Sequence, residues 1–369
     1  MTKAAPAPLK LAMDTQRFRQ LAKRLRAVAP DFDDKTFLSV ALDGLEDLTL
    51  MARVRQASVA IHAACPAGFD GALRMLTEAA PHIGAGFMSL VPPDYVGQYG
   101  RHAGRRAFDA SMNALKFFTQ FGTSEFAVRE FLRDDLPRAL AIMETWSTDS
   151  SDAVRRLASE GSRPRLPWSF RLGEIEADPA LTANIIDNLR ADDSLYVRKS
   201  VANHLNDITK QHPDWVLDRV EAWPAGNPRT AWIVKQALRT LVKQGNPRAL
   251  AAIGAGAAPL VEIGRFAVTP ASIALGDAVT LSFELVSTSP APQRLVVDYR
   301  ITYVKKSGAT SAKVFKLKAL SLPGGQRVSV RRSQHIRDFT TRTHYPGRHE
   351  VELVVNGRRM ASGFFDLRC

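Results

Sequence analysis

Apolar residues recur at helical spacing along the first two thirds of the chain. From about residue 15 to residue 250 they return every three or four positions, as in Phe37, Val40, Ala41, Leu45 and Leu48, without the strict alternation of a β-strand. Proline and glycine interrupt this pattern at Pro30, Pro66, Gly84, Pro92, Pro137, Pro179, Pro213, Pro228 and Pro247. Because proline and glycine commonly stand where helices begin or end, the pattern predicts an all-α region of many short helices.

Three segments of this region resemble one another. VRRLASEG begins at residue 154, VRKSVANHLND at residue 197 and VKQALRTLVKQ at residue 234, so the starts lie 43 and 37 residues apart. A looser copy begins at Val128-Arg129. This period is near that of HEAT-type helix pairs, which stack into a solenoid and place equivalent side chains in rows. The sequence therefore predicts a HEAT-like helical-repeat solenoid.

Each of the three segments opens with Val followed by Lys or Arg. If the valine lies on the buried stripe of its helix, the next residue lies about 100° round the helix axis. Arg155, Arg198 and Lys235 then form one row of cations. Two interpretations stay open at this point: the row binds a polyanion, or the cations only solvate an outer face.

The pattern changes near residue 251. AAIGAGAAP reads as a hinge, and after it the apolar residues alternate with period two, as in VTLSFELVS from residue 279 and RLVVDYRITYV from residue 294. Asn356-Gly357 between two such segments is a strong hairpin signal. Six or seven strands in about 110 residues are typical of an immunoglobulin-like sandwich. We therefore predict a multi-domain chain, with an all-α domain at 1–255 followed by an all-β domain at 260–369.

Positive charge is concentrated in the second domain. The chain has 50 Lys and Arg against 37 Asp and Glu, a net charge of +13, and residues 260–369 alone hold 17 against 8. This excess favours a polyanionic partner over a surface tuned only for solubility, which is the alternative. The cations suited to phosphate contact are Lys305, Lys306, Lys313, Lys316, Lys318, Arg327, Arg331, Arg332, Arg337 and Arg342.

Several classes of protein are disfavoured. The two cysteines, Cys65 and Cys369, predict neither a disulfide framework nor a thiolate metal site, which suits a reducing cytosol. His335, His344 and His349 lack zinc-site spacing, so we expect no metal and no cofactor. The segment MTKAAPAPLKLAMD is too polar for a secretory signal, and no run of about 18 apolar residues predicts a membrane span.

Three blocks carry a family resemblance. FGTSEFAVREFL from residue 121, VRRLASEGSRPRLPW from residue 154 and YVRKSVANHLND from residue 196 closely resemble the DNA alkylation repair glycosylases of the AlkC type, which are relatives of the AlkD group. Helical repeats followed by an immunoglobulin-like tail resemble that family too. The resemblance implies hydrolysis of the N-glycosidic bond of cationic bases such as 3-methyladenine and 3-methylcytosine. It also implies bending of DNA, with the lesion exposed rather than taken into a deep pocket.

The resemblance implies four catalytic residues, Glu125, Glu160, Asp207 and Trp168. Their chemistry suits the reaction, because a cationic base leaves without protonation and the bond breaks toward an oxocarbenium-like sugar. Fixed carboxylates stabilise that cation, and one of them can orient the attacking water. The face of a tryptophan contributes about 0.5 to 2 kcal/mol to binding a cation. The alternative is that the acids are helix-end or solvated charges and that Trp168 covers a core seam.

Cations surround these acids in the sequence. They favour the ionised carboxylates and attract phosphates. Asn203 lies four residues before Asp207, hence on the same helix face, and either positions the sugar or a phosphate or caps the core. The predicted DNA-binding residues are Arg155, Arg156, Arg163, Arg165, Arg198, Lys199, Asn203, Lys235, Arg331 and Arg332.

The sequence thus predicts a DNA glycosylase of base excision repair. No lysine stands out as a Schiff-base nucleophile, so we expect a monofunctional enzyme that does not cleave the strand. Its expected partner is double-stranded DNA carrying alkylated bases, and we expect a monomer in the cytoplasm, associated with the nucleoid and not with a membrane. Two alternatives remain: a non-catalytic HEAT-repeat scaffold that binds nucleic acid, and a protein-interaction solenoid with acidic partners.

Overall fold

The computed structural model describes residues 8–101, 105–339 and 342–368. The chain divides into two compact units, one of Met1–Gln211 with Asn227–Ile233 and the other of His212–Gly226 with Val234–Cys369. The change from helices to strands falls later, between Ala252 and Val261. The domain limits of 1–255 and 260–369 follow that change and stay a prediction.

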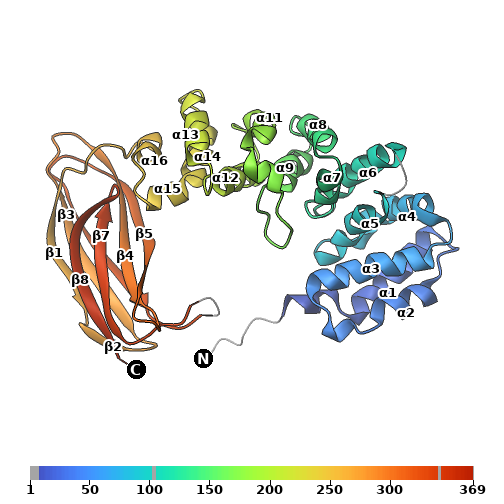
Figure 1. Ribbon diagram of the computed structural model, residues 1–369, viewed down its shortest axis with the longest axis horizontal. Coiled ribbons are helices and arrows are strands. Elements are labelled where there is room, and N and C mark those ends of the chain that lie inside the picture. The colour runs from blue at the N-terminus through green and yellow to red at the C-terminus, as the bar shows by residue number, and fades with distance from the viewer. Residues whose placement is uncertain (1–7, 102–104, 340–341, 369) are drawn as a thin grey trace. The chain divides into compact units, whose positions relative to one another are not determined.

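The first unit is helical, and helices that follow one another in the chain pack side by side (Figure 1). Its helices before the loop at residue 119 are η1 (Leu9–Met13), α1 (Thr15–Val28), α2 (Asp34–Leu42), η2 (Leu45–Asp47), α3 (Leu50–Ala64), α4 (Gly68–Ile83), η3 (Phe87–Leu90), α5 (Val91–Tyr99) and α6 (Arg105–Phe118). The later ones are α7 (Val128–Asp134), α8 (Leu136–Trp146), α9 (Asp152–Gly161), α10 (Gly173–Ala177), η4 (Pro179–Thr182), α11 (Ala183–Asn188) and α12 (Leu195–Ile208).

The second unit contains α13 (Pro213–Ala222), α15 (Arg239–Lys243) and α16 (Pro247–Ala252), while α14 (Pro228–Ala237) contributes to both units. The predicted punctuation is visible at the helix starts, since α13, α14 and α16 each begin at a proline. The first turn of a helix tolerates proline because its N–H groups have no intrahelical acceptor. Pro81 is the exception, because it lies inside α4 near its end.

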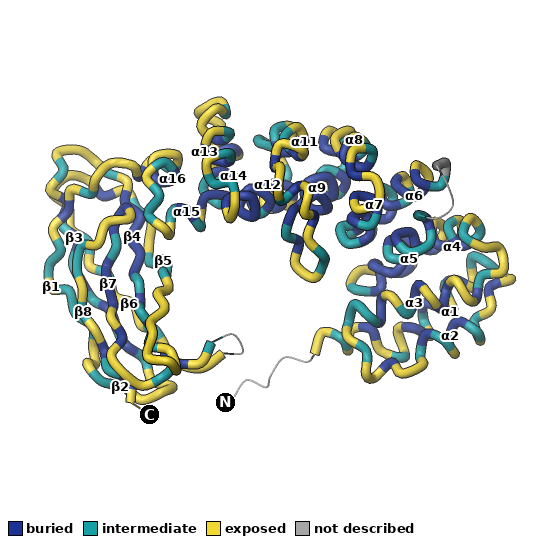
Figure 2. The backbone as a smooth tube through the Cα atoms, viewed as in Figure 1, coloured by how far each residue is buried: buried dark blue, intermediate teal, exposed yellow. Residues whose placement is uncertain are grey.

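The repeated valines lie on the buried side of their helices. Val128, Val154 and Val197 are at most 1% exposed, and Val234 is 7% exposed. Helices α9 and α12, which carry two of these valines, pack against each other and are largely buried in Figure 2. The buried-stripe prediction is therefore confirmed at all four positions.

The arginines that follow two of these valines fold back onto their own repeats. Arg155 Nη1 donates to the carbonyls of Asp149 (2.9 Å) and Ser150 (3.0 Å). Arg198 Nη1 donates to those of Asp192 (2.9 Å) and Asp193 (2.9 Å). In each case the guanidinium group binds the loop that leads into the helix. These two arginines therefore hold their repeats together.

The rest of the second unit is a β-sandwich of two sheets. Its strands are β1 (Val261–Thr269), β2 (Ser272–Ala274), β3 (Ala278–Ser287), β4 (Gln293–Val304), β5 (Thr310–Leu322), β6 (Arg327–His335), β7 (Gly347–Val355) and β8 (Arg358–Arg368). One sheet has the order β1-β3-β6 and the other the order β2-β8-β7-β4-β5. The described residues thus form eight strands, not the six or seven predicted; β2 has three residues, too few to show alternation.

The core between the sheets confirms the alternation that was read in the sequence. Leu281 and Leu285 of β3 and Ile301 of β4 are fully buried. The hairpin between β7 and β8 is confirmed as well, since Asn356 has φ 45° and Gly357 has φ 76°. Positive φ at both central residues is what a type I′ turn requires. The fold of helical repeats followed by an immunoglobulin-like sandwich is therefore as predicted.

The cysteines, the helix lengths and the possible metal ligands were each considered in the sequence. Cys65 follows α3 directly, is half-buried and is not in a disulfide, while Cys369 lies outside the described residues. Among the residues that the structure describes, no helix has the length and apolar character to cross a bilayer. In the same part of the chain, no three His, Cys, Asp or Glu side chains form a group able to hold a metal ion.

One acid is buried in the sandwich. Asp298 lies on β4 where the register with β5 shifts, is 4% exposed, and its Oδ1 has no hydrogen-bond partner among the described residues. Burial raises the pKa of Asp298 to about 6, against the opposing effect of Lys316 and Lys243. The folded state therefore binds this proton more tightly than the unfolded chain does. Protonated Asp298 therefore adds to the free energy of unfolding. This contribution is fully present below about pH 4 and is lost as the pH rises through 6.

We predict that Asp298→Asn stabilises the second unit at neutral pH. The amide has no charge to desolvate, so the gain in unfolding free energy at pH 7.5 is on the order of 1 to 3 kcal/mol and vanishes near pH 4. Denaturant unfolding at both pH values measures it. An equal gain at pH 4 and pH 7.5 would contradict the assignment of the effect to ionised Asp298.

Candidate active site

A hollow of about 530 Å³ opens on the surface of the first unit. Four stretches of chain line it: residues 85–90 at η3, residues 121–126 between α6 and α7, the last turn of α9, and the loop 162–172 that follows α9. Phe87, Phe121, Phe126 and Trp168 supply aromatic walls. The hollow thus combines an apolar lining with the carboxylates described next.

Glu125 and Glu160 both line the hollow and are bridged by one arginine. Arg156 Nη1 pairs with Glu125 Oε2, and its Nη2 lies 3.6 Å from Glu160 Oε1. Thr123 Oγ1 donates to Glu125 Oε2 (2.9 Å) and accepts from Arg156 Nη1 (3.0 Å). Both carboxylates are largely buried, with side chains 12% and 7% exposed. The structure therefore brings two of the three predicted acids to one cavity.

Asp207 joins the same network through Arg163. Arg163 Nη1 donates to Glu160 Oε1 (2.6 Å), while its Nε and Nη2 lie 2.9 and 2.8 Å from Asp207 Oδ2. Lys210 Nζ donates to Asp207 Oδ1 (3.1 Å). Asp207 is 7% exposed and stands behind Arg163, not on the wall of the hollow. Three carboxylates thus alternate with three cations, Arg156, Arg163 and Lys210.

One oxygen of each hollow-facing acid is left open. In the part of the chain that the structure describes, no group donates a hydrogen bond to Glu125 Oε1 or Glu160 Oε2. A carboxylate can accept several hydrogen bonds, so each acid keeps capacity for a further positive partner. The arrangement suits the stabilisation of a cation that enters the hollow.

Trp168 stands at the rim of the hollow in an unusual backbone conformation. It is 61% exposed and has φ 66°, in the left-handed region that costs a non-glycine residue about 1 kcal/mol or more. Such strain persists only where surrounding contacts impose it. The indole is thus exposed to solvent at a position that lines the hollow. Trp168 therefore does not cover a core seam.

His204, on α12 three residues before Asp207, adds no charge to the site. It is fully buried, and its Nε2 lies 3.4 Å from Thr182 Oγ1. Burial lowers the pKa of His204 to about 3, and Arg163 acts in the same direction. The imidazole is therefore neutral at physiological pH and does not serve as a proton donor there.

The other predicted DNA-binding residues are not all near the acids. Arg155 pairs with Asp192 (2.7 Å), and Arg165 Nε donates to Glu176 Oε1 (2.7 Å). Lys199 is exposed on α12, and Asn203 is half-buried with a partner of its own. The second unit holds the half-buried Lys235 and the exposed Arg331 and Arg332. Of the predicted cations, the structure thus brings only Arg156 and Arg163 to the carboxylates.

Some lining residues escaped prediction. Phe121 and Phe126 flank Glu125 in a block that was singled out, so their position beside the acid was a usable signal. Phe87 comes from η3, and nothing in its local sequence links it to residues about 40 positions later. Arg129 does not line the hollow but lies behind it in the looser repeat copy, and nothing in the local sequence predicts that its side chain is fully buried.

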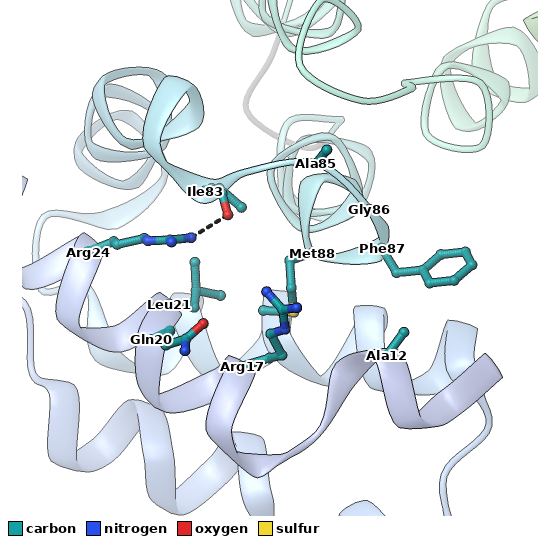
Figure 3. Close-up of a pocket in the computed structure, with 10 residues that line it drawn as sticks. All are labelled: Ala12, Arg17, Gln20, Leu21, Arg24, Ile83, Ala85, Gly86, Phe87 and Met88. Carbon is teal, nitrogen blue, oxygen red and sulfur yellow. Dashed lines mark hydrogen bonds between the residues drawn. The ribbon is translucent and has the colours of Figure 1, made fainter. Parts of the chain in front are cut away.

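A smaller hollow of about 240 Å³ lies next to the first and shares residues 85–87 with it. Arg17, Gln20 and Arg24 of α1 line one side, and Arg24 Nη1 donates to the carbonyl of Ile83 (Figure 3). Phe87 points away from these side chains in the same view. No carboxylate is among its described lining residues, so the chemistry of the acids belongs to the larger hollow.

Comparisons with known proteins identify the family of this chain. A family model described as "DNA alkylation repair enzyme" matches residues 118–241, and one described as the C-terminal Ig-like domain of uncharacterised protein YhaZ matches residues 262–369. The uncharacterized protein YhaZ of Bacillus subtilis (strain 168) is 38% identical over 352 residues, which cover 95% of this chain and 97% of that protein.

A solved structure is more similar still. Alkylpurine DNA glycosylase AlkC of Pseudomonas fluorescens, bound to DNA containing an abasic site analog, is 55% identical with a TM-score of 0.93. The match covers 98% of this chain and 100% of that one. The helical repeats, the immunoglobulin-like domain and the blocks that hold the acids are thus accounted for together, and the chain belongs to the AlkC family of alkylpurine DNA glycosylases.

Proposed function

We propose that this glycosylase hydrolyses the N-glycosidic bond of cationic alkylated bases, 3-methyladenine and 3-methylcytosine, in double-stranded DNA. The observation that carries the proposal is the pair of carboxylates, Glu125 and Glu160, on one hollow with an open oxygen on each. The solved AlkC relative is bound to DNA containing an abasic site analog, which corresponds to the product of such a reaction. We infer a monomer that acts on chromosomal DNA in the cytoplasm, at the nucleoid.

The chemistry follows from the charge of the substrate. When the bond between the base nitrogen and C1′ breaks, its electron pair goes to the base, which leaves neutral, while the sugar becomes an oxocarbenium-like cation. Water then adds to C1′ and loses a proton to a carboxylate. Protonation of the base is not needed, so the enzyme's task is to stabilise the sugar cation and to position the water.

The three acids have distinct places in this scheme. Glu125 and Glu160 face the hollow and are proposed to contact the deoxyribose and the water. Asp207 is proposed to act as the third anion, reaching the site through its contacts with Arg163. Trp168, exposed at the rim, is proposed to lie against the sugar or the cationic base through its π face.

DNA binding is proposed to use both units. Lys199, Arg331 and Arg332 are exposed and suit direct phosphate contacts. Six further residues of the proposed interface already contact protein groups, and phosphates would be additional partners for them. They are Arg155, Arg156, Arg163, Arg165, Arg198 and Asn203. The half-buried Lys235 completes the proposed interface. No lysine among the described lining residues of the hollow offers a Schiff-base nucleophile, which supports monofunctional chemistry.

Removing one negative charge from the network of acids and arginines is predicted to slow base release. Glu160→Gln and Asp207→Asn each lower the single-turnover rate by roughly 10² to 10³, because preorganised charge of this kind supplies a few kcal/mol of transition-state stabilisation. The measurement is chromatographic quantification of free base from a 3-methyladenine or 3-methylcytosine duplex. Glu144→Gln is the control, since Glu144 is exposed on α8 and does not line the hollow. A wild-type rate in Glu160→Gln would remove that residue from the mechanism.

Affinity for DNA is predicted to fall linearly in log salt. Reversing the charge of Arg331 and Arg332 together lowers the slope by about 0.9 for each phosphate that the variant no longer binds, and it weakens binding to damaged and undamaged duplex alike. Titrations at several salt concentrations test this. Arg248→Glu is the control, because Asp218 and Glu221 already pair with Arg248. Weaker binding of damaged DNA alone would contradict the assignment of the two arginines to the backbone.

A further inference from the structure

Arg129, the second residue of α7, has a fully buried side chain. Its Nη1 donates to the carbonyls of Gly161 (3.0 Å) and Arg163 (2.6 Å), and its Nη2 donates to that of Phe170. Among the described residues, Nε has no partner. Carbonyl oxygens are thus the groups that this guanidinium binds. All three acceptors belong to the end of α9 or to the loop that follows it.

The three carbonyls lie at the two ends of the loop 162–172. Gly161 and Arg163 stand where the loop leaves α9, and Phe170 stands where it returns toward α10. A backbone hydrogen bond from Leu172 N to Pro164 O (3.2 Å) also joins the two ends of the loop. The guanidinium group therefore ties both ends of the loop to one buried point. Between these ends lies Trp168, with its strained backbone.

The repeat shows that this contact is specific to one position. After Val154 and Val197, the arginine binds two carbonyls of the loop that leads into its own helix. Arg129 follows Val128 in the same way, yet it binds the loop after a helix two elements later. All three arginines thus bind backbone carbonyls, but only Arg129 of these three binds those of the loop that carries Trp168.

Close packing makes this contact possible. A Cβ atom on Gly161 would lie 2.5 Å from Val128 Cγ1, so the end of α9 approaches the start of α7 more closely than any larger residue allows. Burial lowers the pKa of Arg129 to about 10, so the group remains protonated at neutral pH. The donors are therefore all present, and three carbonyl dipoles replace the water that burial removed.

We infer that Arg129 is a positioning residue for base release: by fixing the loop 162–172 at both ends, it holds Arg163 against Glu160 and Asp207 and holds Trp168 at the rim of the hollow. This inference rests on the proposed function. The carboxylates then meet the sugar in a geometry that is set before DNA binds. Preorganisation of this kind matters because a displacement of about 1 Å can cost on the order of 10²-fold in rate.

The test compares Arg129→Met with Arg53→Met. Arg53 is the matched control, since it is 1% exposed and its Nη1 donates to the carbonyls of Lys10 (3.0 Å) and Met13 (2.9 Å), outside the hollow's lining. Arg129→Lys keeps the buried charge and is the second variant if Arg129→Met does not fold. Three quantities are measured: the single-turnover release of 3-methyladenine, the Kd for DNA with an abasic site analog, and hydrogen exchange of peptides that cover 162–172.

For Arg129→Met we expect release roughly 10- to 100-fold slower, with Kd changed by less than about threefold, because the missing interaction acts on the transition state. Exchange in the loop rises, and Arg129→Lys is intermediate in both. Arg53→Met leaves the rate and the loop exchange of the folded protein unchanged.

Three outcomes overturn the inference. A wild-type rate and wild-type loop exchange in Arg129→Met would show that the loop does not need the guanidinium group. A slower rate without a rise in loop exchange would also overturn it, while leaving the proposed function in place. Faster loop exchange with a wild-type rate would overturn the positioning role and, with it, the assignment of the hollow as the active site.

Discussion

Two guanidinium groups between three carboxylates hold the site of this protein together. Burying a carboxylate without a cation costs several kcal/mol, so Glu125, Glu160 and Asp207 can lie at one place only because Arg156 and Arg163 stand between them. The bridges use one oxygen of Glu125 and one of Glu160. The second oxygen of each glutamate remains open. Such an oxygen suits the stabilisation of a transient sugar cation.

The helical repeat determines where these groups meet. Glu160 lies at the end of α9 and Asp207 near the end of α12, and these two helices pack directly against each other. Each acid lies in the last turn of its helix. Arg163, in the loop just after α9, then spans the gap to the next repeat. Stacking of the repeats thus brings two acids that are 47 positions apart in the sequence close together.

The sequence predicted the elements better than it predicted the side-chain partners. Helical and strand periodicity depend on which residues are apolar, and that information is local, so the repeats and the sandwich were both foreseen. The row of Arg155, Arg198 and Lys235 stays a prediction, because the repeat period alone does not say whether a long side chain reaches solvent or folds back as Arg155 and Arg198 do. Arg129 and Phe87 depend on contacts between distant segments, which no local pattern records.

The charge balance of the hollow also bears on the cationic substrate that is proposed for it. A neutral damaged base leaves readily only when an acid protonates it. In the described lining of the hollow, Glu125 and Glu160 are paired with arginines, and Arg163 is committed to Glu160 and Asp207. His204 is close in sequence but is buried and neutral. A base that already carries positive charge needs no such acid. Under the proposed function, the same ion pairs that make burial of the carboxylates tolerable therefore favour leaving groups that alkylation has already activated.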